Sequence, residues 1–317
     1  MKYRAIIREA WGLTQENKKL MWWFGFVPAL LSFLVSMVYL SYQAFSLWTS
    51  PYVRQGATEV HLISDLARAV VDLFEREPAL GTFGVIMLAL MGAVYLLLPV
   101  FCQSALIQLV ARIRAGEPLS IARGISYGFT RFLQLFEYNA FIKTFSLVGV
   151  FTEATFVFRI FGPEPFKLFS WIFLLVLVVG LICTLLFTYA EYYIVIDKEG
   201  VLNSIVKSGG LVIRQWHHTL FMLLLMAVIV IRVLLNLVVA LLVPAIVLAP
   251  IFFFTSLTLA KIGVIVGAIV GLVVLYFASY FIGIFHVFTT TVWTFTFLDL
   301  TREESKVVDL HEAASKD

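Results

Sequence analysis

The sequence predicts an all-α integral membrane protein, a six-helix bundle that carries interfacial amphipathic helices on its cytoplasmic side. The first observation is composition, since 61% of the 317 residues are hydrophobic and only 14% are charged. Soluble domains contain about 45–50% apolar and about 25% charged residues. The second observation is a series of apolar runs longer than the roughly 20 residues that cross a bilayer. We therefore expect one transmembrane domain over residues 1–317, without a sizeable soluble domain.

Six apolar segments account for most of the chain. The first opens on Trp22-Trp23, and tryptophan is enriched at membrane interfaces. The third is the least apolar, and the last meets no proline before the C terminus. That last segment extends to about Leu298, roughly 60 Å at 1.5 Å per residue, so we expect it to protrude or tilt. The expected spans are roughly residues 21–42, 83–110, 132–160, 166–196, 219–247 and 256–298.

Lysine and arginine residues indicate the orientation, because cytoplasmic loops carry an excess of these bases. If the N terminus is cytoplasmic, fifteen bases fall in inner segments and five in outer ones. The sequence therefore predicts a multi-pass protein of the inner (cytoplasmic) membrane, with both termini in the cytoplasm. The inner bases are Lys2, Arg4, Arg8, Lys18, Lys19, Arg112, Arg114, Arg123, Arg131, Lys198, Lys207, Arg214, Arg302, Lys306 and Lys316, and the outer ones are Arg54, Arg68, Arg76, Lys167 and Lys261.

Two polar segments flank the spans. The outer loop at 47–82 contains an amphipathic pattern over residues 59–76, with Ile63, Leu66 and Val70 at helical spacing. We expect this helix to lie on the outer membrane surface or to cap the bundle, and a ligand-binding lid is the alternative. Residues 299–317 form the expected cytoplasmic polar tail.

A short motif recurs before three of the spans. The tetrapeptides that begin at Ala5, Ser120 and Ser204 share a small residue, an isoleucine, an aliphatic residue or alanine, and then a base. Each opens a segment of mixed polarity that leads through a basic junction to an aromatic residue and an odd-numbered span. The chain thus divides into three possible repeats of an interfacial helix and two spans, over residues 1–116, 117–199 and 200–317.

Amphipathic helices with bases on one side lie in the membrane interface and attract anionic headgroups. We therefore expect membrane lipids as partners, anionic on the cytoplasmic side, together with a possible homo-oligomer or membrane partner protein, and no nucleic acid. The candidate headgroup contacts are Arg8, Lys18, Lys19, Arg123, Arg131, Lys207 and Arg214.

Two stretches carry a resemblance to known proteins, YYIVIDKEGVLNSIVKSGGLVIRQWHHTL and AWGLTQENKKLMWWFGFVPALLS. The chain resembles uncharacterised six-span bacterial inner-membrane proteins. That group includes the membrane domain found ahead of some glycerophosphodiester phosphodiesterases. The resemblance covers the topology and implies a fold. It implies no reaction, because the catalytic barrel of those phosphodiesterases is absent from this sequence.

Several charged residues lie within the expected spans, where a charge costs about 2.5–3.5 kcal/mol on insertion scales. We expect the interhelical pairs Lys143–Glu191 and Arg232–Glu153. Two interpretations stay open, since the pairs either hold the helices in register or line a polar cavity for a headgroup, an ion or a substrate. The candidate charged layer comprises Lys143, Arg232, Glu153, Glu191, Asn139 and Asn236.

Glycines in the last span suggest a close helix contact. Gly263, Gly267 and Gly271 form a row with a four-residue spacing, which lets another helix approach closely. We expect packing within the chain, and homodimerisation is the alternative.

Sequence motifs for catalysis are absent. His217 and His218 are adjacent, so they do not form a metal pair, and the chain contains no HExxH, CxxC, phosphate loop or nucleophile elbow. We expect no metal and no cofactor. The preferred function is a non-enzymatic membrane protein that organises lipid or partner proteins. A permease or lipid transporter that uses the charged layer is the alternative, and a lipid-modifying enzyme has the least support.

Overall fold

Every regular element that the structure describes is helical. The computed structural model describes residues 3–48, 68, 71–72, 75–118, 120–143, 147–253 and 257–314. The expected outer helix over residues 59–76 therefore falls almost wholly outside the described residues. The elements are α1 (Tyr3–Glu16), α2 (Lys18–Leu20), the π-helix η1 (Met21–Phe26), α3 (Val27–Trp48), α5 (Pro78–Arg114), α6 (Ile121–Thr130), α7 (Phe132–Lys143), α8 (Leu147–Phe161), α9 (Pro163–Leu186), α10 (Ala190–Val195), α11 (Val201–Arg214), α12 (Trp216–Phe253) and α13 (Leu257–Ala314).

Five described helical runs are long and apolar enough to cross a membrane, which fits a multi-pass membrane protein. They are Lys18–Trp48, Pro78–Arg114, Pro163–Leu186, Trp216–Leu235 and Gly271–Arg302. The expected third span is not confirmed as one helix, because it consists of the shorter helices α7 and α8. The expected fourth span ends as a long helix at Leu186 and continues as the short helix α10.

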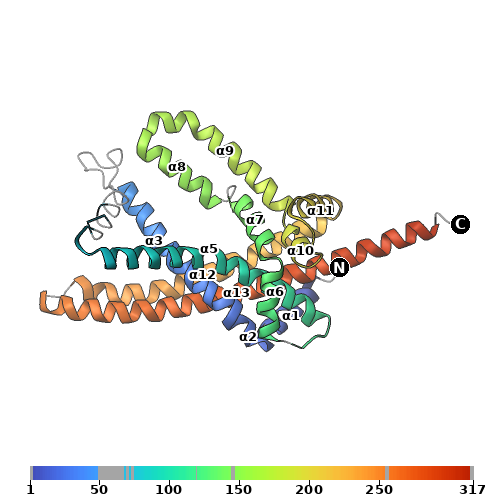
Figure 1. The fold of residues 1–317 in the computed structure, drawn as a ribbon, viewed down its shortest axis with the longest axis horizontal. Coiled ribbons are helices and arrows are strands. Elements are labelled where there is room, and N and C mark those ends of the chain that lie inside the picture. Colours follow the sequence, from blue (N-terminus) through green and yellow to red (C-terminus); the bar gives the residue numbers. More distant parts are fainter. Residues whose placement is uncertain are drawn as a thin grey trace.

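Helices α5 and α13 form the spine of the bundle. Both contribute to two buried apolar clusters, one shared with α1, η1 and α12 and the other with α7, α10 and α11. Helix α13 has 58 residues and projects beyond the other helices toward the C terminus (Figure 1). At 1.5 Å per residue its length is about 87 Å, far more than the ~30 Å of a hydrocarbon core. The expected polar tail is helical from residue 299 to Ala314.

Arg114, the last residue of α5, joins three elements at one point. Its guanidinium lies 2.8 Å from an Asp299 carboxylate oxygen and 3.6 Å from a Glu9 carboxylate oxygen. The guanidinium also donates a 2.8 Å hydrogen bond to the Phe295 carbonyl and lies over the Phe295 ring. Arg114 therefore fastens α1 and α13 to the end of α5.

Among the described residues, two helices cross closely at glycines that do not belong to the predicted row. A Cβ built on Gly25 of η1 would lie 2.7 Å from the Gly283 carbonyl oxygen. A Cβ on Gly283 would lie 2.9 Å from the Phe26 backbone, so the two backbones meet directly. The same construction at Gly271 meets nothing within 4 Å. The contact expected at Gly271 is therefore not confirmed among the described residues, and the packing around Gly263 and Gly267 lies outside them, so the glycine row stays a prediction.

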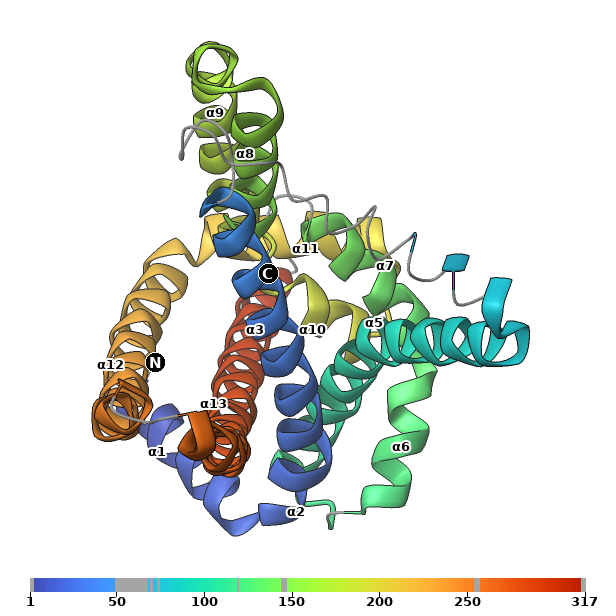
Figure 2. The ribbon, with the colours of Figure 1, turned by 90° about the vertical axis from the view of Figure 1, so that its left-hand side faces the viewer.

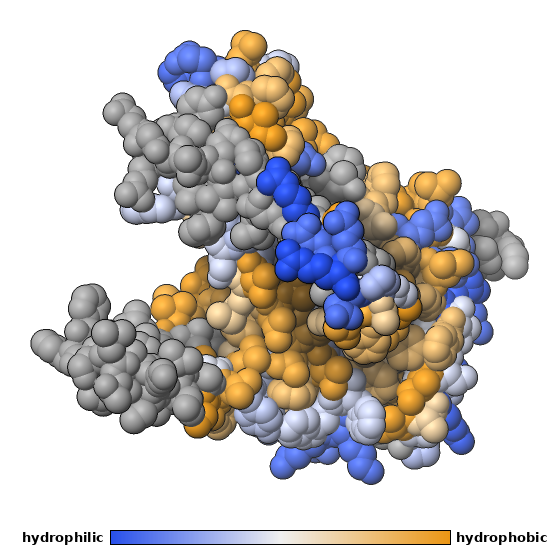
Figure 3. All heavy atoms as spheres, turned by 60° about the vertical axis from the view of Figure 1, so that its left-hand side comes forward, coloured by the Kyte–Doolittle hydropathy of each residue, from blue (hydrophilic) through white to orange (hydrophobic). Residues whose placement is uncertain are grey.

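Helices α8 and α9 form a hairpin that leans away from the spine in both ribbon views (Figures 1 and 2). Trp171, Leu174 and Leu181 of α9 are more than half exposed. Broad areas of apolar surface also cover the face shown in Figure 3. Such surface suits lipid, because soluble monomers rarely expose apolar patches larger than a few hundred Å².

The Gly25–Gly283 crossing predicts a position-specific loss of stability. Replacing Gly283 with valine forces the backbones of η1 and α13 apart and costs about 1–3 kcal/mol, as overpacking does. Gly271→Val is the matched control, because the site on the same helix is open. We expect thermal unfolding in detergent, followed by size-exclusion chromatography, to show a lower midpoint for Gly283→Val alone. Equal midpoints for the two variants would contradict the close crossing.

Candidate functional site

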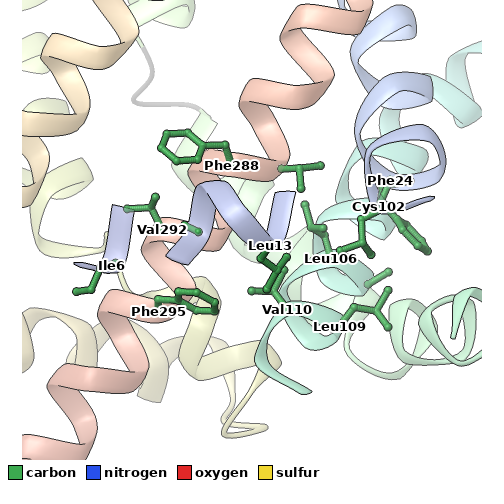
Figure 4. Packing of buried hydrophobic residues seen from close by; sticks show 14 of the residues in the cluster. Ile6, Leu13, Phe24, Cys102, Leu106, Leu109, Val110, Phe288, Val292 and Phe295 are labelled. Carbon is green, nitrogen blue, oxygen red and sulfur yellow. The ribbon is translucent and has the colours of Figure 1, made fainter. Parts of the chain in front are cut away.

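Helices α1, α6 and α11 gather at one end of the bundle, opposite the end where α12 finishes and α13 begins (Figure 1). We call it the amphipathic end. Helix α1 turns Ile6 and Leu13 inward, toward Val110 of α5 and Val292 and Phe295 of α13 (Figure 4). The apolar side of α1 therefore packs on the protein, whereas we expected this helix to lie in the membrane interface.

Helices α6 and α11 pack on the bundle through small or short side chains. Gly124 and Gly128 of α6 are buried, and a Cβ at either would overlap side chains of α5. Ser208 and Val212 are buried at the corresponding positions of α11. When the tetrapeptides that begin at Ala5 and Ser204 are aligned, the buried positions of α1 fall one residue later than those of α11. One residue is a 100° rotation, so α6 and α11 share a packing register, and the threefold repeat is not confirmed.

The opposite face of α11 is apolar and exposed. Leu202, Val206 and Ile213 are 80%, 73% and 68% exposed. At 100° per residue they lie within about 40° of one another, on one stripe. On α6, Ile125 and Phe129 are exposed in the same way, one turn apart. Both helices thus present large apolar side chains away from the bundle.

Bases accompany these apolar stripes. Arg123 of α6 and Lys207 and Arg214 of α11 are exposed. Lys207 also forms a 2.6 Å ion pair with Glu199. Hydrogen bonds from Lys207 and Asn203 lower the pKa of the Glu199 carboxyl, and the bond to Glu199 raises the pKa of Lys207. Lys207, expected to contact headgroups, is thus partly neutralised by its own chain.

The remaining predicted headgroup contacts differ in their surroundings. Arg131 is half-buried and donates a 2.8 Å hydrogen bond to the Gln134 side chain. Arg8, Lys18 and Lys19 are exposed on the α1–α2 segment.

Two grooves flank α1. One, of about 650 Å³, lies between α1 and α12, and the other, of about 440 Å³, lies between the α1–η1 segment and α13. The first combines two bases, and the second one base, with aromatic and aliphatic side chains. The first is lined by Tyr3, Arg4, Ala5, Arg8, Phe221 and Leu225, and the second by Trp11, Thr14, Gln15, Lys18, Met21, Tyr280 and Ile284.

The break between α9 and α10 lies beside α11. The Ser208 hydroxyl donates a 2.8 Å hydrogen bond to the Leu186 carbonyl and accepts a 3.0 Å bond from the Tyr189 N–H. The Tyr138 hydroxyl of α7 donates a 2.8 Å bond to the Phe187 carbonyl. Ser208 thus satisfies two backbone groups at the break, as a break in apolar surroundings requires, and Tyr138 adds a second bond to the Phe187 carbonyl, which also accepts from the Ala190 N–H.

Glu191 follows the break and has a partner that the sequence did not suggest. The Gln103 side-chain amide of α5 donates a 2.5 Å hydrogen bond to the Glu191 carboxylate. Glu191 is half-buried in this position. The expected partner, Lys143, is the last residue of α7, and its side chain lies outside the described part of the chain.

The structure does not bring Arg232 and Glu153 together. Both side chains are exposed, and they form no ion pair with each other. The physical reason is the α8–α9 hairpin, which carries Glu153 away from α12 (Figures 1 and 2). Asn139 bonds to the Leu135 carbonyl of its own helix, and the Asn236 side chain is outside the described residues. The predicted charged layer is therefore not one site among the described side chains.

A polar contact between α3 and α8 was missed by sequence reasoning. The Arg159 guanidinium donates hydrogen bonds to the Tyr42 hydroxyl at 3.2 Å and to the Ser46 hydroxyl. The Tyr39 hydroxyl bonds to Thr152 one further turn along, and Gln43 donates to Tyr39 at 2.8 Å. The available signal was the polar row on α3, whose members are spaced by three or four residues.

The described residues include no group of three or more His, Cys, Asp or Glu side chains that could hold a metal ion. Comparisons with protein-family models, curated proteins and solved structures find no match to this chain. The resemblance to six-span inner-membrane proteins therefore stays a prediction.

The junction between α9, α10 and α11 predicts that two serines on one face of α11 differ in importance. Ser208→Ala leaves the Leu186 carbonyl and the Tyr189 N–H without their partner and costs about 1–3 kcal/mol. Ser204→Ala is the control, because the buried Ser204 hydroxyl has no hydrogen-bond partner. We expect Ser208→Ala alone to lower the thermal midpoint in detergent. A loss of equal size at Ser204 would show that the Ser208 bonds contribute little.

Proposed function

We propose that this chain is a non-enzymatic inner-membrane protein that organises anionic lipid around its amphipathic end. The observation that carries the proposal is the outward face of α11, where Leu202, Val206 and Ile213 form an exposed apolar stripe. Lys207 and Arg214 lie beside this stripe. A helix with an apolar face and neighbouring bases is the kind that lies at the boundary between acyl chains and headgroups.

Helix packing supports a fixed position for this stripe. Because Ser208 is bonded to the α9–α10 break and Leu211 and Val212 are buried, α11 cannot rotate its apolar stripe inward without losing these contacts. Helix α6 supports the same arrangement with exposed Ile125 and Phe129 beside Arg123. In the proposal this end faces the cytoplasm, where the inner leaflet is anionic.

The α8–α9 hairpin favours a second candidate function, a lipid transporter. The hairpin leans away from the spine and meets α3 through the hydrogen bonds of Arg159 and Thr152 (Figure 2). A movement of this hairpin would admit a lipid between it and α3. Transfer of fluorescent lipid between leaflets of reconstituted vesicles separates this function from a purely organising one.

The proposed function predicts selective retention of anionic lipid. Purified protein in nanodiscs of equal phosphatidylglycerol and phosphatidylcholine, analysed by native mass spectrometry after release, should retain several-fold more phosphatidylglycerol. The enrichment should fall as ionic strength rises, because exposed charges are screened over about 10 Å at 0.1 M salt. A retained lipid mixture equal to the nanodisc composition would overturn the proposal.

A further inference from the structure

The groove between α1 and α12 places two bases opposite two apolar side chains. Arg4 and Arg8 are one helical turn apart on α1, so their side chains project from the same face. Phe221 and Leu225 are one turn apart on α12 and line the facing wall. In Figure 2, α1 lies between α12 and α13. The groove lies on the α12 side of α1, since its lining residues come from these two helices.

Tyr3 holds the two walls of the groove at a fixed separation. Its hydroxyl is hydrogen-bonded to Nδ1 of His218, the third residue of α12. Its ring lies 4.6 Å from the Phe221 ring, centroid to centroid. The far side of α1 is held as well, since Glu9 lies 3.6 Å from Arg114 and Ile6 and Ala10 are buried. The groove is therefore preformed by contacts that leave its two arginines uninvolved.

The charge of the groove is positive and uncompensated among the described residues. Its lining includes Arg4 and Arg8 but no acidic side chain. Both arginines are exposed, and neither forms an ion pair with a described residue. Two guanidinium groups one turn apart offer several N–H donors to one phosphate, the geometry that arginine provides best.

The apolar wall leads from the groove to the lipid-facing surface of α12. Phe221, Leu224 and Val228 are 48%, 57% and 67% exposed along this helix, which is one of the five candidate spans. An occupant that places its anionic group at the arginines thus meets continuous apolar surface along α12. This combination matches a phospholipid, with a phosphate at one end and acyl chains at the other.

We propose that the groove between α1 and α12 is a specific binding site for one anionic phospholipid. Arg4 and Arg8 hold its phosphate, and an acyl chain lies against Phe221 and Leu225. The inference rests on the proposed function, because it names one place and one lipid class within the wider attraction of the amphipathic end.

The test compares two double variants that lose the same charge. Arg4→Gln/Arg8→Gln removes both bases of the groove, and Arg76→Gln/Lys198→Gln removes two exposed bases that lie outside it and are not among the candidate headgroup contacts. Full-length protein in detergent is titrated with phosphatidylglycerol, and bound lipid is counted by native mass spectrometry. The groove variant should bind the first lipid at least tenfold more weakly, and the control should stay within twofold of the unaltered chain. Size-exclusion profiles verify that each variant is folded.

A third variant examines the apolar part of the site without changing charge. Ala5→Trp fills the groove from an exposed position on α1, and we expect it to weaken the first binding event at least fivefold. Phosphatidylcholine with identical chains should bind at least tenfold more weakly than phosphatidylglycerol. Glycerol phosphate and inorganic phosphate at millimolar concentration should not displace the bound lipid.

Failure of the groove site and failure of the proposed function would give different results. Equal losses in the two double variants would overturn the groove and leave diffuse attraction, with the proposed function intact. Displacement by glycerol phosphate would replace the lipid site with a site for soluble phosphate esters, which also overturns the inference. No preference for phosphatidylglycerol in the unaltered chain would remove the proposed function together with the groove.

Discussion

The fold depends on one requirement of apolar surroundings, that a backbone group freed by a break in a helix must find a partner within the chain. The break after Leu186 is the clearest case. Ser208 serves both a carbonyl and an N–H at this break, and Tyr138 serves a second carbonyl. These bonds hold α7, α10 and α11 in one cluster, whose apolar members then pack on α5 and α13. The position of α11, and hence of its outward stripe, follows from this junction.

Buried polar groups in the spine also find their partners within the chain. Helix α13 buries Thr291, Thr294 and Thr296, and each hydroxyl donates to the carbonyl four residues earlier in its own helix. These hydroxyls therefore need no partner from another helix. Arg114 is different, since its charge reaches Asp299, Glu9 and the Phe295 carbonyl together. Arg114 thus links α5 to α1 and α13, whereas the buried threonines bond only within α13.

Sequence patterns gave the helical class, the long apolar helices and the helical segments α1, α6 and α11. These features depend on composition and local periodicity, which a single chain displays directly. The sequence did not predict the partners of Arg232 and Glu153 correctly, because these depend on where α8 lies relative to α12. Glycine spacing did not indicate the close crossing between Gly25 and Gly283, because neither glycine belongs to a spaced row. Such a contact joins residues from opposite ends of the chain, and no local pattern records it. The partners of Arg159 lie on α3, and the polar row on α3 was a local signal of a contact but did not identify Arg159 as the partner.

The crossing of Gly25 and Gly283 also bears on biosynthesis. Membrane helices emerge from the ribosome in sequence order, yet η1 and α1 take their packing partners from α13. The first span is therefore made long before the helix that completes its packing. Until α13 arrives, Gly25 lacks its contact with Gly283, and the buried side of α1 has only α5 and α12 to cover it. Insertion of the final helix thus closes the bundle, and a chain that ends before α13 leaves its own beginning unpacked. A quality-control system that recognises exposed small residues, or basic helices without packing partners, would therefore detect the loss of α13 through the exposed surface of the first span.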